Sequence, residues 1–370
     1  MTSAHPAGDT RIFHKQCRSL ANAGYKVTLI APYSGEQTAE DGVQIRAVHQ
    51  HSNRLWRMIN TTRVIYHEAL AVNAEVYHFH DPELIPVGLA LRARGKRVIY
   101  DIHEDLPRTL SYKPYIRPWM RKPLEKVVDV GERLATRFFS GLIVANPSSI
   151  PRFRECAPLA VVQNFPLMRE FEAITASEDF AKREFVTYVG QRITRARGAE
   201  EMVHAIGLLR DQVPLRLKLV GHIEPPELLS DLEVLPGWGR VDYAGTLGRS
   251  GVVAAVQGAL AGLVVLHPEP NYVTAQPVKL FEYMGAGIPV IASDFPILRS
   301  IIEGAGCGVV VDPTDPVEIA RAILHLHKNR DLARAMGERG RQAMNSRYNW
   351  ASEERELLRM YRQLCSQSPA

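Results

Sequence analysis

Short β-branched runs alternate with helical patterns from one end of this chain to the other. Such alternation places successive strands parallel in a sheet that helices cover on both faces. Two of the helices, Arg11–Ala23 and Glu83–Arg94, are each followed by a glycine that can end them. The pattern therefore predicts a doubly wound α/β fold. The predicted strands of the first half are Lys26–Ala31, Val43–Val48, Val76–His80, Arg97–Asp101, Gly141–Ala145 and Ala160–Gln163.

The alternation pauses at Phe165–Glu184, where hydrophobic periodicity is weak, and then restarts. A chain of 370 residues also exceeds one ordinary core. We therefore expect two Rossmann-like domains, over residues 1–168 and 169–347, followed by a C-terminal helix over 348–370. The strands predicted in the second domain are Phe185–Val189, Leu215–Val220, Val241–Ala244, Gly262–Leu266, Pro289–Ser293 and Gly308–Val311.

The first domain lacks an opening strand. Doubly wound domains usually begin with a strand, and the loop after it carries ligand-binding groups. This chain instead opens on what looks like that loop, Ser3–Thr10. Either the true start lies upstream and supplies the strand, or the first sheet is built differently.

Composition and charge narrow the class of protein. The hydrophobic content of 46% and charged content of 23% are those of a soluble globular protein, and the polar start is not a signal peptide. The four cysteines lie far apart, so we expect free thiols and a cytoplasmic location. Residues 1–170 hold 23 Lys and Arg against 16 Asp and Glu, so this half carries the basic excess. A basic half can face a phosphate-bearing substrate, an anionic membrane or nucleic acid, or can simply be a basic surface.

A helix at Pro277–Gly285 has the setting of a phosphate site. It follows a buried strand and the loop Glu269–Gln276, so its N-terminus lies at the carboxyl edge of a parallel sheet. Unpaired amides and the helix dipole favour an anion there. Lys279 can reach a diphosphate, and Glu282 can accept hydrogen bonds from ribose hydroxyls. The alternative is an ordinary helix with a surface Lys and Glu.

The run Lys279–Ser293 resembles the retaining glycosyltransferases of family 4, which have the two-domain GT-B fold. The resemblance implies that Glu282, the second Glu of the family's Glu-x7-Glu element, holds the donor ribose. The first Glu falls on Thr274, a departure that implies different sugar recognition, an unusual sugar or weakened catalysis. The resemblance places the donor against residues of this loop and helix, namely Thr274, Gln276, Pro277, Val278, Lys279 and Glu282.

Further positions match the family on other predicted strands. Gly190 and Arg192 end one strand, and Arg197 follows just before a helix; the resemblance places both arginines on the donor diphosphate, with Arg195 as a rival to Arg197. Gly221 ends the next strand and is expected to border the nucleotide. With Lys279, the two arginines would stabilise the leaving group.

On the acceptor side, the resemblance assigns His103 to the reacting centre. His80 is also expected to point at the cleft, whereas Asp81 is interpreted mainly as a helix N-cap. Gly8, Asp9 and Arg11 match the family's acceptor loop, whose usual double glycine is absent. The helix after residue 348 resembles the family's terminal helix, which returns to the first domain.

The resemblance implies a UDP- or GDP-sugar donor, no metal or other cofactor, and a glycan or lipid-linked acceptor, with bacterial surface polysaccharide synthesis as the setting. Basic and aromatic residues across 108–137 favour an anionic membrane surface on the inner face of the plasma membrane, the alternative being a solvated basic helix. No nucleic-acid module is recognised. A nucleotide-sugar 2-epimerase on the same fold and a non-catalytic partner in polysaccharide assembly are the competing functions.

Overall fold

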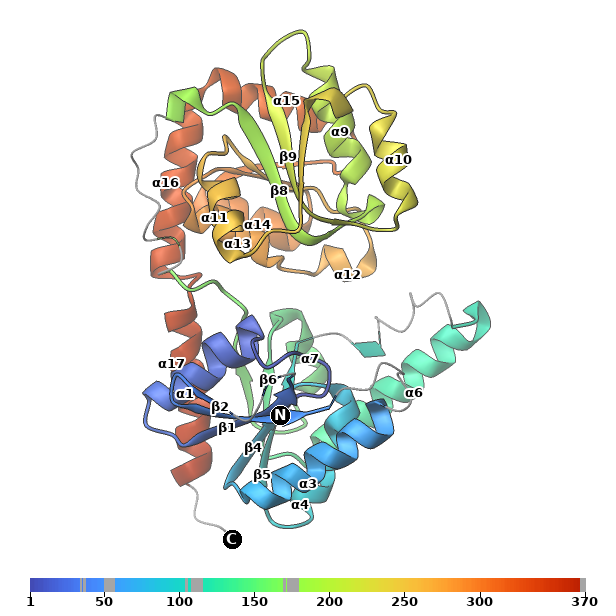
Figure 1. The fold of residues 1–370 in the computed structure, drawn as a ribbon, viewed down its shortest axis with the longest axis vertical. Coiled ribbons are helices and arrows are strands. Elements are labelled where there is room, and N and C mark those ends of the chain that lie inside the picture. The colour runs from blue at the N-terminus through green and yellow to red at the C-terminus, as the bar shows by residue number, and fades with distance from the viewer. Residues whose placement is uncertain are drawn as a thin grey trace. The chain divides into compact units, whose positions relative to one another are not determined.

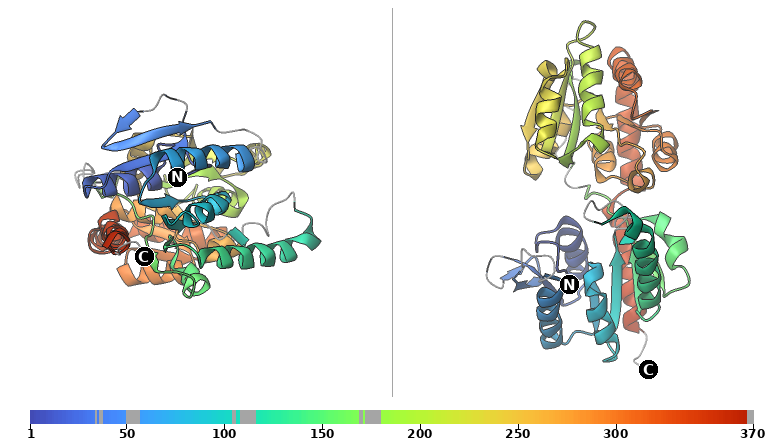
Figure 2. Two further views of the ribbon diagram at one scale, coloured as in Figure 1. Left: turned by 90° about the horizontal axis from the view of Figure 1, so that it is seen from below. Right: turned by 90° about the vertical axis from the view of Figure 1, so that its right-hand side faces the viewer.

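The computed structural model describes residues 1–33, 35, 38–49, 57–103, 106–107, 116–168, 171 and 180–366. The chain forms two compact units (Figures 1 and 2). Unit 1 comprises Met1–Asn164 and Trp350–Ala370, and unit 2 comprises Phe165–Asn349. Of the predicted linker, only 165–168, 171 and 180–184 are described.

Unit 1 contains two sheets rather than one. The first has the order β1-β3-β2, with β1 (Val27–Pro32) parallel to β3 (Val43–Val48) and β2 (Thr38–Glu40) antiparallel to β3. The second sheet is parallel, in the order β4-β5-β6-β7. Its strands are β4 (Val76–Phe79), β5 (Arg97–Ile102), β6 (Gly141–Val144) and β7 (Leu159–Val161).

The helices of unit 1 pack on these sheets around a core in which Phe79 stacks on Tyr100 and Phe139 meets both rings edge-on. The helix predicted at Arg11–Ala23 consists of a wider π-helical segment and a short α-helix, η1 and α1. The helical elements are η1 (Thr10–Cys17), α1 (Arg18–Asn22), η2 (Arg57–Thr61), α3 (Thr62–Val72), η3 (Pro82–Leu84), α4 (Ile85–Arg92), α6 (Pro118–Thr136), η4 (Pro147–Ser149) and α7 (Ile150–Phe153).

The last helix, α17 (Trp350–Ser366), packs on unit 1. Trp350 Nε1 donates to Ser19 Oγ at 2.9 Å, and the Gln163 N–H donates to Glu353 at 2.6 Å. The Tyr361 hydroxyl lies 3.0 Å from His78 Nδ1. The return of the terminal helix to the first domain is thus confirmed.

Unit 2 is one parallel sheet in the order β10-β9-β8-β11-β12-β13. The chain moves outward from β8 to β10 and then restarts on the other side of β8. The strand order therefore reverses between β8 and β11, and ligands bind beyond the carboxyl ends of strands at such a point. The strands are β8 (Phe185–Ile193), β9 (Arg216–Ile223), β10 (Val241–Gly245), β11 (Gly262–Val264), β12 (Val290–Ser293) and β13 (Gly308–Val311).

Apolar clusters bury both faces of this sheet, as a parallel sheet requires. The loop predicted at Glu269–Gln276 contains one helical turn, α12. The helical elements are η5 (Phe180–Lys182), η6 (Arg195–Arg197), α9 (Ala199–Leu208), α10 (Glu227–Glu233), η7 (Trp238–Arg240), α11 (Arg249–Gln257), α12 (Pro270–Val273), α13 (Val278–Gly285), α14 (Pro296–Ala305), α15 (Pro316–Lys328) and α16 (Arg330–Ser346). In the part of the chain that the structure describes, no helix is both long and apolar enough to cross a membrane.

Candidate active site

Helix α13 begins at the reversal point of the unit 2 sheet. Pro277 is its N-cap and Val278 its first residue, and no side chain caps the helix, so its N-terminus faces a ligand with backbone amides. The Val189 N–H of β8 donates to the Tyr283 hydroxyl at 2.9 Å, which ties the helix to the central strand. Thr274 and Gln276, both half-buried, lead from α12 into this N-terminus.

Lys279 carries the strongest sign of a ligand site. Its side chain lies in the first turn of α13 and is only 8% exposed, yet Nζ has no hydrogen-bond partner among the described residues. The amine lies 3.3 Å from the ring centroid of Tyr188. Burial, reinforced by the charge of Arg197, lowers the pKa of Lys279 well below its usual value, and Glu282 opposes this shift. A buried amine of this kind is stabilised by an anion.

Of the three arginines, Arg197 is the one whose charge acts on this amine. Its Nε donates to the Tyr272 hydroxyl at 3.3 Å, and its charge contributes to the pKa shift of Lys279. Arg195, the rival from the sequence, pairs instead with Glu200 at 2.8 Å and with Asp231. The side chain of Arg192 is 60% exposed and pairs with Glu224 at 3.4 Å.

Two glycines hold backbones close together beside Lys279. Gly221 has a φ of 141°, and a Cβ there would lie 2.2 Å from the Gly190 carbonyl oxygen. A Cβ on Gly190 would in turn lie 3.0 Å from Lys279 Nζ. Side chains at either position would therefore fill the space next to the amine.

Glu282 lies one turn beyond Lys279 and is 14% exposed. Its carboxylate is paired with Arg249, at the start of α11. The carboxylate that is predicted to bind the ribose is thus already paired with Arg249, a residue that sequence analysis did not single out.

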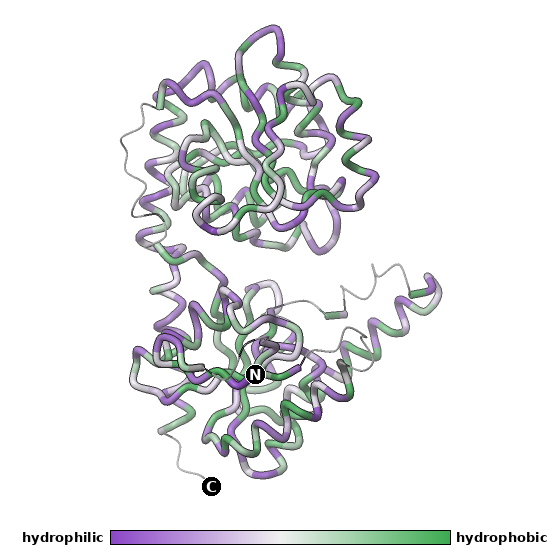
Figure 3. Tube along the Cα trace, in the orientation of Figure 1, coloured by the Kyte–Doolittle hydropathy of each residue, from purple (hydrophilic) through white to green (hydrophobic). Residues whose placement is uncertain are grey.

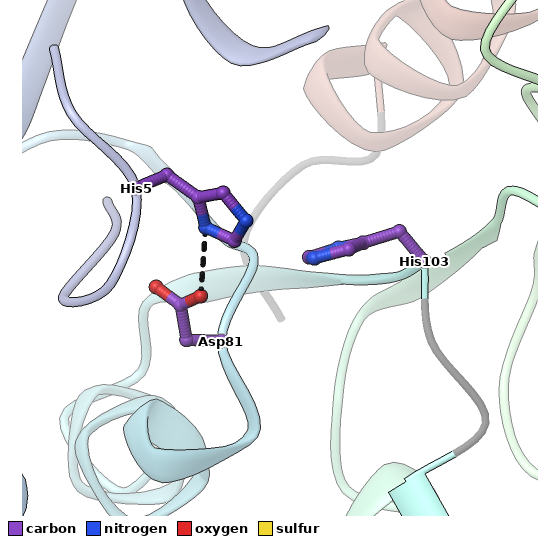
Figure 4. Close-up of side chains that lie close together, drawn as sticks. All are labelled: His5, Asp81 and His103. Atoms are coloured by element: carbon purple, nitrogen blue, oxygen red, sulfur yellow. Dashed lines mark ion pairs between the residues drawn. The ribbon is translucent and has the colours of Figure 1, made fainter. Parts of the chain in front are cut away.

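In unit 1, three side chains meet at the carboxyl ends of β4 and β5 (Figure 4). Asp81 lies 3.0 Å from His5 Nδ1, and the ring of His103 meets that of His5 edge-on at 5.1 Å. His103 Nδ1 is buried with no hydrogen-bond partner in the described structure. The two rings and the carboxylate therefore form one cluster, here called the His5 cluster.

Asp81 anchors the opening loop. It accepts hydrogen bonds from the Thr2 hydroxyl at 2.6 Å and from the Ser3 N–H at 2.7 Å. Burial alone would raise the pKa of Asp81, but the bonds from His5 and Thr2, with the charge of His5, hold it well below its usual value. Asp81 occupies the N-cap position of η3, with Pro82 after it as expected, but its side chain makes no cap hydrogen bond and binds the opening loop.

Two predicted acceptor-side residues belong to a buried network. Arg11 makes two hydrogen bonds to Asp101, at 2.9 and 3.2 Å, and one to the Val162 carbonyl. His80 Nδ1 lies 3.4 Å from Asp101, and the His80 and His78 rings stack. Burial lowers the pKa of His80 well below its usual value, although Asp101 opposes the shift. Arg11 and His80 thus join β5 to its neighbours, and their acceptor role stays a prediction.

Asp9 also has a structural role. Its carboxylate accepts hydrogen bonds from the Arg11 and Ile12 N–H groups at 2.8 and 2.9 Å, which caps η1. Gly8 is exposed beside it, and a Cβ there would contact nothing within 4 Å. Neither residue is aimed at the His5 cluster by any of these contacts.

Among the residues that the structure describes, two groups have atoms close enough to hold a cation: the His5 cluster, and His78 with His80 and Asp101. In both groups the carboxylate already accepts hydrogen bonds from protein donors, Thr2 and Ser3 on Asp81 and Arg11 and Gln16 on Asp101. The arrangement in each case satisfies the carboxylate without requiring a metal ion.

Sequence analysis missed His5, Arg249 and the tyrosines around Lys279. His5 stands in the opening loop, and Asp81 directly follows the predicted strand Val76–His80. These two positions were a signal that His5 and Asp81 could meet. Arg249 and Tyr188 gave no such signal.

These features define a glycosyltransferase of the GT-B type, an enzyme with two Rossmann-like domains. Two family models match the chain: "Glycosyltransferase Family 4" over residues 8–164 and "Glycosyl transferases group 1" over residues 170–343. Together they span most of the chain, which belongs to this family of glycosyltransferases. The predicted family, fold and enzyme class are confirmed.

Relatives are distant. An MMP α-(1→4)-mannosyltransferase of Mycolicibacterium hassiacum is 23% identical over 76% of this chain and 69% of its own. A phosphatidyl-myo-inositol mannosyltransferase of Mycobacterium leprae is 22% identical over 78% of this chain and 73% of its own.

Solved structures share the fold. Sucrose-phosphate synthase of Thermosynechococcus elongatus has a TM-score of 0.77 and 20% identity, over 98% of this chain and 94% of that one. The Anabaena protein HepE, solved with UDP and glucose, has a TM-score of 0.68 and 14% identity over 95% of each chain.

Proposed function

We propose that this glycosyltransferase moves a hexose, with retention of configuration, from a UDP- or GDP-sugar to a glycan or lipid-linked acceptor. The observation that carries the proposal is the buried amine of Lys279 at the N-terminus of α13, which has no hydrogen-bond partner among the described residues. A diphosphate would supply its missing counter-charge. The UDP bound to HepE and the mannosyl transfer named for two relatives support a nucleotide-sugar donor.

In the proposed donor site, Lys279, Arg197 and the α13 amides neutralise the charge that develops on the leaving diphosphate. Arg192 is exposed and can turn to the same group. Glu282 accepts hydrogen bonds from the ribose, exchanging Arg249 for those hydroxyls. Gly190 and Gly221 leave room for the phosphates.

The reaction we propose is a same-face displacement. The bond from the sugar C1 to the diphosphate oxygen breaks, and C1 bonds to the acceptor oxygen on that face. The acceptor proton passes to the leaving phosphate, so no metal or other cofactor is needed. His103, whose ring contacts that of His5, is the group of unit 1 that we propose at the reacting centre.

The acceptor side is proposed to meet an anionic lipid surface through α6. The side chains of Trp119, Val127, Val130 and Leu134 are 54–71% exposed and share one face of the helix. Lys122, Lys126 and Arg133 are exposed along one border of that face. Cations beside an exposed apolar stripe suit an anionic interface. The predicted segment begins at 108, but residues 108–115 lie outside the described part of the chain.

The proposed cellular setting is bacterial surface polysaccharide synthesis on the inner face of the plasma membrane. An acceptor carried on a lipid would be presented at that surface, which is where α6 would hold the enzyme. The two mannosyltransferase relatives do not by themselves assign this role.

The donor is tested by measuring Tm with UDP, GDP and their sugars. We expect one nucleotide series to raise Tm, since a ligand that binds only the folded state stabilises it. The anomeric configuration of the product, followed by NMR, then tests retention. If neither nucleotide series raises Tm, the proposed donor site is wrong. Conversion of the donor to its 2-epimer without an acceptor would favour the epimerase alternative.

A further inference from the structure

The two sheets of unit 1 each present an edge to a gap between them. Among the described strands, β1 is hydrogen-bonded only to β3, and β4 only to β5. The unpaired backbone groups of such edges are ready to bind another strand.

Met1 and Thr2 connect the two edges. The Met1 amine donates to the His78 carbonyl at 2.6 Å, and the Met1 carbonyl accepts from the His80 N–H at 3.3 Å. This pair of bonds around one residue of β4 is that of a parallel ladder. The Thr2 N–H donates to the Ile30 carbonyl of β1 at 3.0 Å. The first two residues therefore pair with both edges at the carboxyl ends of β1 and β4.

Beyond this contact the gap is hollow. A cavity of about 560 Å³ is lined by both edges, including Thr28 and Ile30 of β1 and Val76 and His78 of β4. Helical residues, among them Gln16, Cys17 and Tyr361, also line the cavity. Protein interiors contain few voids larger than a water molecule, which occupies about 30 Å³. The cavity therefore has the size of a missing structural element.

Backbone groups on both edges point into this cavity. N–H and C=O groups alternate sides along a strand, and the Ile30 and His78 carbonyls already face Thr2 and Met1. The groups of Thr28 and Val76, two residues earlier on each strand, therefore face the same gap. Gln16 Oε1 and His78 Nε2 are buried there without a hydrogen-bond partner in the described structure.

A charged amine at Met1 is unfavourable in this buried position. Burial lowers its pKa, while the nearby Cys17 and Asp81 oppose the shift. As a peptide N–H, the same nitrogen could keep its bond to the His78 carbonyl without carrying a charge.

We propose that the gap binds one further β-strand of about four residues, joined to Met1 and parallel to β1 and β4. The residue directly before Met1 donates its N–H to the Thr28 carbonyl, and the one before that donates to the Val76 carbonyl. The two sheets then become one parallel sheet with this strand at its centre. Because the strand is buried on both faces, its residues are apolar and mainly β-branched.

The proposal is tested on three full chains: residues 1–370, the same chain extended by Met and five Val or Ile residues, and a length-matched extension with proline at the two positions before Met1. Proline cannot donate the two ladder bonds. We expect the apolar extension to raise the Tm of unit 1 by about 5 °C or more, and the proline extension to raise it by less than half as much. Equal Tm values, or equal gains from both extensions, would contradict the strand.

Thiol labelling gives a second measurement. Cys17 lines the cavity, whereas Cys156 does not and serves as the internal control. We expect the apolar extension to slow the labelling of Cys17 at least tenfold, with Cys156 unchanged. An unchanged Cys17 rate would overturn the proposal, as would equal protection by the unattached peptide, which would indicate a separate chain.

Intact-mass analysis of the protein from its native cells identifies the natural occupant. A mass with several apolar residues before Met1 is expected. A native chain that begins at Met1 or Thr2 would refute the joined strand.

Discussion

At the residue scale, the proposed donor-binding role of Lys279 would come at the expense of the fold. Its amine is buried against Tyr188 and lacks a partner in the described structure, so a positive charge is unfavourable there in the unliganded protein. Functional sites often keep such groups because the ligand compensates for them. The chemistry was expected from the sequence, but its burial was not.

We predict that Lys279→Met lowers kcat/KM at least 100-fold, because the leaving diphosphate loses a buried cation. The same change should leave Tm unchanged or raise it, since a buried charge is replaced by an apolar chain of similar length. Kinetics and thermal unfolding of one preparation check both. A large fall in Tm would show that Lys279 supports the fold.

The lowered pKa of Lys279 also gives a pH dependence. A lysine whose folded pKa lies below its unfolded value of about 10.4 costs stability at low pH, and the cost disappears as pH rises from the folded pKa towards the unfolded one. A bound diphosphate favours the charged amine, so donor binding should take up protons above the lowered pKa. Calorimetry in buffers of different ionisation enthalpy measures this uptake, and Lys279→Met should abolish it.

Glu282 should act on the ribose alone. We predict that Glu282→Ala weakens binding of UDP or GDP about tenfold, the effect of losing about 1.4 kcal/mol of hydrogen bonding. Its effect on the 2′,3′-dideoxynucleotide should be much smaller, because the hydroxyls that Glu282 would bind are absent. Equal losses for both nucleotides would place the role of Glu282 elsewhere.

Arg11 is the structural counterpart. Its guanidinium makes two hydrogen bonds to Asp101 in the buried network. We predict that Arg11→Met destabilises unit 1 by about 3–5 kcal/mol in urea unfolding, because it leaves a buried carboxylate uncompensated. Adding Asp101→Asn should recover part of that loss, and no recovery would argue against charge as the cause.

At the scale of elements, α6 differs from the other helices of unit 1. Its buried residues, Glu132, Ala135 and Thr136, all lie near its C-terminal end. The earlier part extends beyond the sheet in Figure 1, and hydrophobic and hydrophilic residues alternate along it in Figure 3. The sequence predicted the basic and aromatic character of this segment, but only the structure shows that its apolar face lacks packing.

We predict that the protein sediments with vesicles containing anionic lipid and not with neutral vesicles. Changing Val127, Val130 and Leu134 together to Ser should reduce that binding at least fivefold, because the apolar stripe is lost. Val234→Ser in unit 2 is the matched control, since Val234 is also exposed, at 81%. If the triple variant binds as well as the parent, α6 is not the membrane face.

At the scale of the whole molecule, one compact unit is built from two separate parts of the chain. Residues 350–366 follow unit 2 in sequence but belong to unit 1, where Trp350, Leu357, Met360 and Leu364 are buried. The cavity in unit 1 is the other large-scale feature.

We predict that deleting residues 350–370 lowers the Tm of unit 1 by 10 °C or more, because several buried side chains are lost. Nucleotide should still raise the unfolding temperature of unit 2, whose donor residues are untouched. Scanning calorimetry with and without the nucleotide separates the two transitions. Loss of nucleotide stabilisation would show that the donor site depends on α17.

The family, the parallel α/β architecture and the helix at Pro277–Gly285 could be predicted from the sequence, because apolar periodicity and the run Lys279–Ser293 are local properties of the chain. The same local pattern showed that the first domain lacks an opening strand. Tertiary structure decided the state of each side chain. It directed Arg11 and His80 to Asp101, Arg195 to Glu200 and Asp231, and Asp81 to His5, while it left Lys279 without a partner in the described structure. These pairings join residues up to 90 positions apart. They depend on which strand ends become neighbours, and that is settled only when the sheets assemble.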